Sequence, residues 1–87
     1  MGSVVVHDID LLEVFMEMLQ GKRDDLESLY GELGTETTNQ ESNWKDPQYD
    51  YLKEKVDSYC SACRVQLNQL DESISYISGL IAKLRNL

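Results

Sequence analysis

The sequence predicts an all-α fold: an antiparallel helical hairpin that pairs into a four-helix bundle. Three observations support this fold class. Apolar residues recur every three or four positions along two long segments, a polar stretch with the only proline separates the segments, and apolar and polar residues alternate with a period of two only near the valine run 4–6. At 87 residues the chain forms one domain at most, and so small a domain buries only a modest share of its surface. We therefore expect help from a partner chain.

The first segment predicts a helix over residues 9–34, after an N-terminal arm of residues 1–8. Its apolar stripe has spacings of three, four, seven, three and four, and Lys22 fills the missing slot. The stripe keeps its phase across Gly21, which predicts one continuous helix. Asp10 or Asp8 caps the start, and Gly34 suits a left-handed cap after an end at Leu33 or one turn beyond. The stripe consists of Leu12, Phe15, Leu19, Leu26, Leu29 and Leu33.

The second segment predicts a helix over residues 47–87, after a polar joint of residues 35–46. Asp46 offers its carboxylate to the free amides of the first turn, and Pro47 gives up no hydrogen bond at the first helical position. Apolar residues then recur almost to the last residue, with Gly79 as the only glycine. They are Tyr49, Leu52, Val56, Cys60, Cys63, Leu67, Leu70, Ile74, Ile77, Ile81 and Leu84.

Both helices carry more apolar surface at their open end than one partner helix covers. Seven of the nine residues from Leu11 to Leu19 are apolar, and the longer second helix is expected to overhang the first with apolar turns. A second hairpin, most simply another copy, would cover this surface. The alternative is that Val4, Val5 and Val6 fold back over the first helix. The expected partner contacts are Leu12, Phe15, Met16, Leu19, Ile74, Ile77, Ile81 and Leu84.

The only tryptophan lies in the polar joint, in the sequence SNWKDPQYD. An acidic chain of under about a hundred residues with two helices and a mid-chain Trp in the joint resembles the WXG family of type VII secretion substrates and their partner proteins. Trp44-Lys45-Asp46 stands where the family has Trp, any residue and Gly, and Tyr49 follows. The resemblance implies that Trp44, with Asp46, Pro47 and Tyr49, fastens the hairpin. A Trp beside a helix start has the same expected role on general grounds.

The resemblance implies a function in protein binding and export. The protein would be a secreted substrate or, because the family's tyrosine and acidic export mark is missing after the second helix, a targeting partner that covers the helical domain of a larger effector. The partner is then the chain itself or that domain. Its location would be cytoplasmic, or secreted without a cleaved signal peptide, since the valine run lacks the charged and apolar regions of a leader.

The CxxC sequence at Cys60 and Cys63 is the one motif that suggests redox or metal chemistry. A redox pair normally lies at a helix start after a strand, and a zinc site needs further ligands, whereas here His7 is the only histidine. Both cysteines fall on the apolar stripe, which predicts free, buried thiols.

No other pattern predicts catalysis, a cofactor or a metal. The carboxylates lie off the stripes, where spaced charges solvate a helix, and Gly31 and Gly34 have no strand before them and no Lys and hydroxyl pair after them. We expect a protein that is not an enzyme.

The net charge of −8 argues against nucleic acid and anionic membrane surfaces as partners, and no apolar run predicts a membrane span. Lys22 either snorkels or meets an acidic residue of a partner chain. An alternative function is a cytosolic acidic binding protein, such as an immunity protein or adaptor, that neutralises a basic partner. A third is a segment of a longer coiled coil, which the capped joint disfavours.

Overall fold

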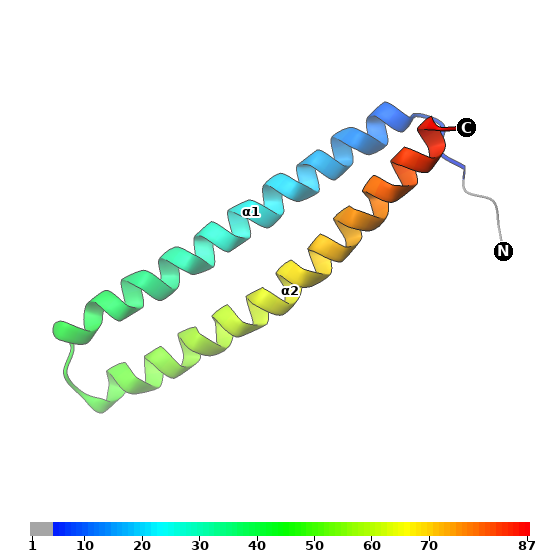
Figure 1. Cartoon of the computed structure of the whole chain (residues 1–87). Helices are drawn as coiled ribbons and strands as arrows, with labels where there is room; N and C mark the ends of the chain where they lie inside the picture. Colours follow the sequence, from blue (N-terminus) through cyan, green and yellow to red (C-terminus); the bar gives the residue numbers. More distant parts are fainter. Residues whose placement is uncertain (1–4) are drawn as a thin grey trace.

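The protein is an antiparallel pair of long helices in a single layer. A computed structural model describes residues 5–87. Helix α1 spans Ile9–Asn39, a short 3-10 helix η1 spans Gln40–Ser42, and α2 spans Pro47–Arg85. The joint lies at one end, and the first turn of α1 and the last turn of α2 lie at the other (Figure 1). The overall dimensions of 62 × 24 × 15 Å fit one layer of two helices, since a helix with side chains is about 10–12 Å wide.

The prediction of a helical hairpin is confirmed, and its two capping aspartates explain where the helices begin. The Asp8 carboxylate accepts a hydrogen bond from the Leu11 backbone N–H at 3.0 Å, so Asp8 and not Asp10 caps α1. Asp46 caps α2 through the Gln48 N–H at 2.7 Å, with Pro47 at the first helical position as predicted. Both caps satisfy amides that have no partner inside the helix.

Helix α1 ends later than the sequence suggested. Gly34 was expected to end it with a left-handed residue, but no described glycine has a positive φ, and α1 continues to Asn39. The hydroxyls of Thr37 and Thr38 donate to the Leu33 and Gly34 carbonyls at 2.7 and 3.0 Å, which keeps these residues within the helix. The joint is therefore shorter than expected.

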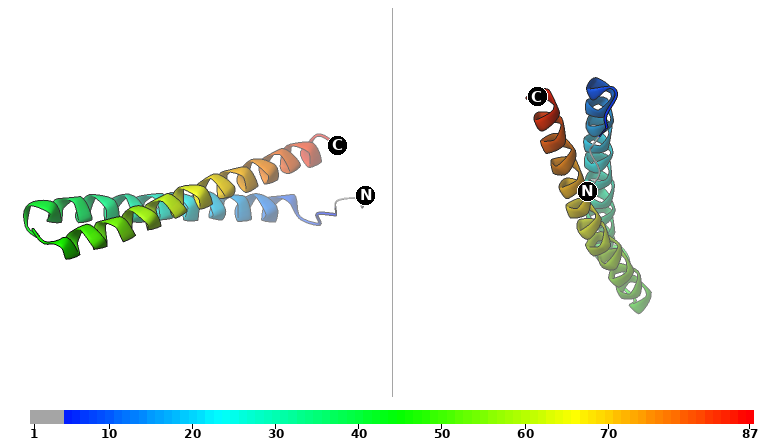
Figure 2. Two further views of the ribbon diagram at one scale, coloured as in Figure 1. Left: turned by 90° about the horizontal axis from the view of Figure 1, so that it is seen from below. Right: turned by 90° about the vertical axis from the view of Figure 1, so that its right-hand side faces the viewer.

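The expected overhang of the second helix is wrong. An Arg85 Nη2 lies 2.9 Å from Asp10 Oδ1, so the last turn of α2 reaches the first turn of α1. Figure 2 shows that the two helices cross, and side-chain contacts join them both at the joint, through Tyr49 and Thr37, and at the open end, through Arg85 and Asp10. Because α1 is longer than predicted, it accompanies α2 to its end.

The core is a single row of side chains between the two helices, which we call the seam. On α2 the seam follows the predicted stripe except at Leu52, which is 41 % exposed. The buried residues are Val56, Cys63, Leu67, Ile74 and Ile81, with Tyr49 at the joint. On α1 no residue is fully buried. Its half-buried members are Ile9, Leu12, Met16, Leu19, Arg23, Leu26, Tyr30, Gly34 and Thr37.

This seam differs from the predicted stripe of α1 at four positions. Leu12, Leu19 and Leu26 face α2 as expected. Phe15 and Leu29 do not: they are 46 and 59 % exposed, and their neighbours Met16 and Tyr30 take the inner positions. In the same way Arg23 occupies the slot that was assigned to Lys22, which is exposed. The last of the four positions is Leu33, which is 39 % exposed while its neighbour Gly34 is half-buried.

The glycines of α1 offer a test of the helix itself. Gly21 lies in the helix interior, its backbone is right-handed, and a Cβ added there would meet nothing within 4 Å. Alanine at this position should raise the free energy of unfolding by about 0.5–1 kcal/mol, because glycine loses more backbone entropy in a helix. Urea unfolding at fixed protein concentration measures this, with Gly79→Ala as the matched change in α2. A loss of stability would show that Gly21 touches another chain.

Candidate partner-binding face

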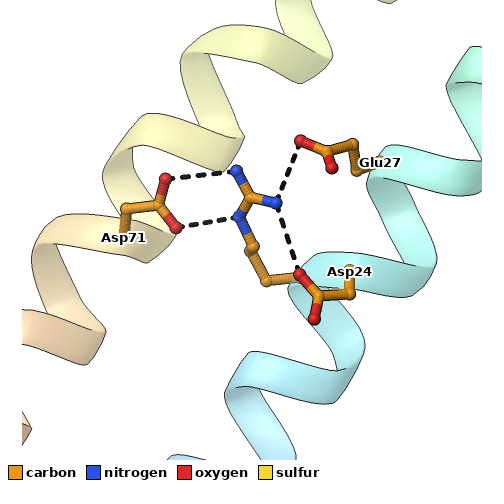
Figure 3. Close-up of polar contacts among 4 residues, drawn as sticks. Asp24, Glu27 and Asp71 are labelled. Atoms are coloured by element: carbon orange, nitrogen blue, oxygen red, sulfur yellow. Dashed lines mark hydrogen bonds and ion pairs between the residues drawn. The ribbon is translucent and has the colours of Figure 1, made fainter.

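Arg23 joins the two helices near the middle of the seam (Figure 3). Its Nε lies 2.8 Å from Asp71 Oδ1 and its Nη2 lies 3.3 Å from Asp71 Oδ2, which gives a two-pronged pair across the helices. Nη1 also contacts Glu27 at 2.9 Å and Asp24 at 3.3 Å. The hydrogen bond to Asp71 raises the pKa of Arg23 above its ordinary value. The pair between the helices forms only when Asp71 stands opposite Arg23, so this contact helps to set the alignment of the helices.

Arg85 makes a second set of ion pairs at the open end. Its Nη2 contacts both Asp10 and Glu13 of α1. The Arg23 and Arg85 contacts lie on the same side of the seam, because their partners occupy equivalent positions. On α1, Glu13 and Glu27 directly follow the seam residues Leu12 and Leu26. On α2, Asp71 and Arg85 directly follow the seam residues Leu70 and Leu84. We call this side of the hairpin the ion-pair face.

The opposite side of the seam carries most of the exposed apolar residues of the hairpin, while Val14, Tyr51 and Val65 lie on the outer surface of the helices. This opposite side is formed by residues that directly precede the seam positions and by their neighbours one turn away, and we call it the apolar face. Leu11, Met18 and Tyr76 at its open end are 66, 47 and 69 % exposed. Among the described residues, no large exposed apolar side chain lies on the ion-pair face. The apolar face contains Leu11, Phe15, Met18, Leu29 and Leu33 of α1 and Leu52, Tyr59 and Tyr76 of α2.

The apolar row on this face is broken at its middle by Lys22 and Asp25 of α1 and by Gln69 and Ser73 of α2, so its exposed apolar residues gather in two groups toward the ends of the hairpin. Single exposed apolar residues are normal, whereas contiguous apolar patches mark interaction surfaces. Of the valines expected to fold back over α1, Val5 is 70 % exposed, Val6 is half-buried near Asp10 and Arg85, and Val4 lies outside the described residues. The apolar face is therefore the candidate site of this protein.

The predicted partner contacts divide between this face and the seam. Phe15 lies on the apolar face. Ile74 and Ile81 are buried between the helices. Met18, Tyr59 and Tyr76 were not predicted as partner contacts, although each directly precedes a residue of a predicted stripe. The remaining five predicted contacts are half-buried along the seam: Leu12, Met16, Leu19, Ile77 and Leu84.

The four predicted joint residues come together. The Trp44 indole Nε1 donates to Asp46 Oδ2 at 2.8 Å, while Oδ1 of the same carboxylate caps α2. The Trp44 and Tyr49 rings lie 5.9 Å apart between centroids and are inclined by 60°, a tilted arrangement that suits aromatic pairs. Pro47 stands between the two aromatic residues at the start of α2.

Tyr49 makes the link from the joint back to α1. Its side chain is 4 % exposed, and its hydroxyl donates to the Thr37 carbonyl at 2.9 Å. Trp44 is half-buried and holds the N-terminal end of α2 through Asp46 and Tyr49. The fastening expected of Trp44 is thus divided between two aromatic residues, because only Tyr49 is placed on the inner side of α2.

Both cysteines are free and lie in the seam, as predicted. The Cys60 thiol is half-buried and donates to the Tyr30 carbonyl at 3.6 Å, and Cys63 is buried. Beside them a groove of about 630 Å³ opens on the ion-pair face near the joint, where Gly31 and Gly34 of α1 have no side chains to fill it. A Cβ at Gly34 would lie 3.9 Å from Cys60 Sγ, an ordinary contact.

Neither metal coordination nor membrane insertion gains support from the structure. Over residues 5–87, no three His, Cys, Asp or Glu side chains gather in a way that could hold a metal ion. No helix in that range has a stretch that is long and apolar enough to cross a membrane. Comparison with known proteins finds no matching family model, curated protein or solved structure.

The joint makes a prediction about Asp46, whose two oxygens accept different hydrogen bonds. Replacing Asp46 by Ala should lower the free energy of unfolding by about 1–2 kcal/mol, since the cap of α2 is lost and the indole loses its acceptor. Asp46→Asn keeps one acceptor oxygen, so its free energy of unfolding should lie between those of the wild type and Asp46→Ala. Denaturant unfolding measures the loss, and Trp44 fluorescence reports the freed indole.

The matched control is Asp50→Ala, which removes an exposed acidic residue from the first turn of α2 without removing a cap. An Asp46→Ala variant no less stable than this control would contradict the assigned role.

Proposed function

We propose that this protein is a WXG-like hairpin of a type VII secretion route, and that it binds another helical hairpin through its apolar face. It would act as a secreted substrate or as the targeting partner of a larger exported effector. The observation that carries the proposal is the row of exposed apolar side chains along one side of the seam. The Trp44 joint supports the WXG-like assignment, because it closes the hairpin with a tryptophan at mid-chain.

A second hairpin suits this face in shape. The present layer is 15 Å thick, and the two apolar groups of the row lie toward opposite ends of the same side of the hairpin. A second layer of two helices would convert the row into the interior of a four-helix bundle, where side chains from facing helices fill the core. A single short peptide would leave much of the row in water.

The ion-pair face favours the second candidate, an acidic protein that binds a basic partner. Glu27 and Asp24 stand on this side, and acidic residues outnumber basic ones by 16 to 8. The two candidates use opposite faces, and they differ in their response to salt. Apolar association persists at high ionic strength, whereas binding between exposed charges weakens.

Phe15 gives the first test of the apolar face. Glutamate at this position should abolish assembly, because its charge would be buried against apolar side chains. The control is Val65→Glu, since Val65 is also exposed but lies on neither face beside the seam. Sedimentation equilibrium in low and high salt measures assembly. Equal assembly by both variants would rule out the apolar face.

A monomeric wild-type protein would still allow the test. A dye that binds apolar surfaces should then bind the wild-type chain, and Phe15→Glu should reduce its binding more than Val65→Glu. Equal dye binding by the two variants would contradict the proposal.

Export is the test of the secretion route. In a bacterium with a type VII system, the chain or an effector that depends on it should reach the medium only when the secretion ATPase is present. Export that is the same without the ATPase would contradict the route and leave the binding face in place.

A further inference from the structure

The groove beside the two cysteines is a gap in the packing of the helices. Elsewhere along the seam α1 places long side chains against α2, such as Leu19 and Leu26, whereas Gly31 and Gly34 place none. The groove holds about 630 Å³, and small-molecule sites commonly hold about 300–1,000 Å³. It opens on the ion-pair face, so a hairpin bound at the apolar face would leave it accessible.

The two thiols at this groove differ in how far the protein covers them. Cys63 is buried in the seam, while Cys60 is half-buried. A Cβ placed on Gly34 would lie 3.9 Å from Cys60 Sγ, so glycine at this position leaves the sulfur open toward the groove. Cys60 is therefore the thiol that a molecule in the groove reaches first.

Arg64 brings a positive charge to the same groove. It is exposed and, unlike Arg23 and Arg85, has no ion-pair partner among the described residues. Arg64 stands four residues after Cys60, so the two side chains lie on one face of α2 with their Cβ atoms about 5–6 Å apart. A guanidinium with free N–H groups binds a carboxylate through two parallel hydrogen bonds. The groove thus suits a ligand that carries a carboxylate close to a sulfur.

The wall formed by α1 adds uncharged polar groups. Thr35 and Asn39 border the groove, and neither side chain makes a hydrogen bond within residues 5–87. A hydroxyl and a primary amide suit the amide groups of a peptide. Glu27 at the end away from the joint is paired with Arg23, so its charge is already met.

We infer that Cys60 is a thiol-exchange site, and that the groove binds the disulfide of a small, peptide-like thiol that carries carboxylates. The Cys60 thiolate attacks one sulfur of the bound disulfide. A new S–S bond joins Cys60 to that half, the S–S bond of the reagent breaks, and the other half leaves as a thiolate that takes up the proton released by Cys60. The disulfide is the only oxidant that this step needs.

Arg64 holds the carboxylate of the half that remains on Cys60, and Cys63 stays covered by the seam. The product is a mixed disulfide, a reversible cap that keeps a thiol from irreversible oxidation. This site lies across the seam from the apolar face, so the inference stands apart from the proposed function and does not depend on it.

The first test identifies the product and the reacting thiol. The reduced full-length chain is mixed with oxidised glutathione, and intact mass spectrometry should show the gain of one glutathionyl group. Cys63→Ala should react like the wild type, and Cys60→Ala should not react. Modification chiefly at Cys63, or a Cys60 to Cys63 disulfide as the final product, would overturn the inference.

The role of Arg64 is tested with two disulfides of different charge. Arg64→Gln should slow the reaction with anionic oxidised glutathione about threefold, the effect of one exposed charge, and leave the reaction with neutral bis(2-hydroxyethyl) disulfide unchanged. The control is Lys83→Gln, which removes a positive charge from an exposed position of α2 outside the groove and should slow neither reaction. Equal effects of the two variants on glutathione exchange would exclude a binding role for Arg64.

The groove itself is tested by filling it. A Cβ at Gly31 or at Gly21 would meet nothing within 4 Å, so leucine fits at both positions, but only Gly31 borders the groove. Gly31→Leu should therefore slow both disulfides severalfold, while Gly21→Leu should react like the wild type. In urea all variants should react at one rate, which separates access in the folded chain from the reactivity of the thiol. A folded Gly31→Leu chain, with its helices confirmed by circular dichroism, that reacts as fast as Gly21→Leu would overturn the groove as the binding site.

Discussion

Two helices in one layer share a single seam, and this constraint determines most features of the molecule. A helix turns only one side toward its neighbour, so an apolar surface wider than one stripe cannot be buried within the hairpin. Helix α1 has no fully buried residue, and the buried apolar side chains are all contributed by α2. Most of this surplus gathers on one side of the seam. The hairpin therefore has an apolar face and an ion-pair face, and each offers a partner different chemistry.

Arg23 connects the internal order of the hairpin with the division of its surface. An arginine in the seam costs apolar contact, but its planar guanidinium spans to Asp71 with two hydrogen bonds that require a defined alignment of the helices. The guanidinium of Arg23 also pairs with Glu27 and Asp24 on the same side of the seam. The charges needed to align the helices are thereby concentrated on one face, which leaves the opposite face with few paired charges and free for apolar association.

The sequence predicted features that depend on local chemistry and missed those that depend on the opposite helix. Asp46 and Pro47 mark the start of α2 by rules that need no tertiary contact. In α1, however, Phe15 and Met16 are adjacent, as are Leu29 and Tyr30, so the apolar spacing fits two registers of the helix. The contact between Arg23 and Asp71 selects the register in which Met16 and Tyr30 face α2. The candidate face was predicted as excess apolar surface at the open end, but most residues assigned to it belong to the seam. The length of α1 was underestimated because Gly34 resembles a cap, whereas Thr37 and Thr38 continue the helix.

The open end of the hairpin has a consequence for the order of events in folding. Contacts near the joint, such as Tyr49 with Thr37, join residues close in the chain and close only a short loop, whereas Arg85 reaches Asp10 across 75 positions. The helices should thus come together from the joint outward, with the termini docking last and separating first. Amide hydrogens in the first turns of α1 should exchange with solvent sooner than those near Tyr49. A chain bound over Leu11 and Phe15 would hold these turns closed, so the arrival of a partner would be recorded as slower exchange at the end of the molecule farthest from Trp44.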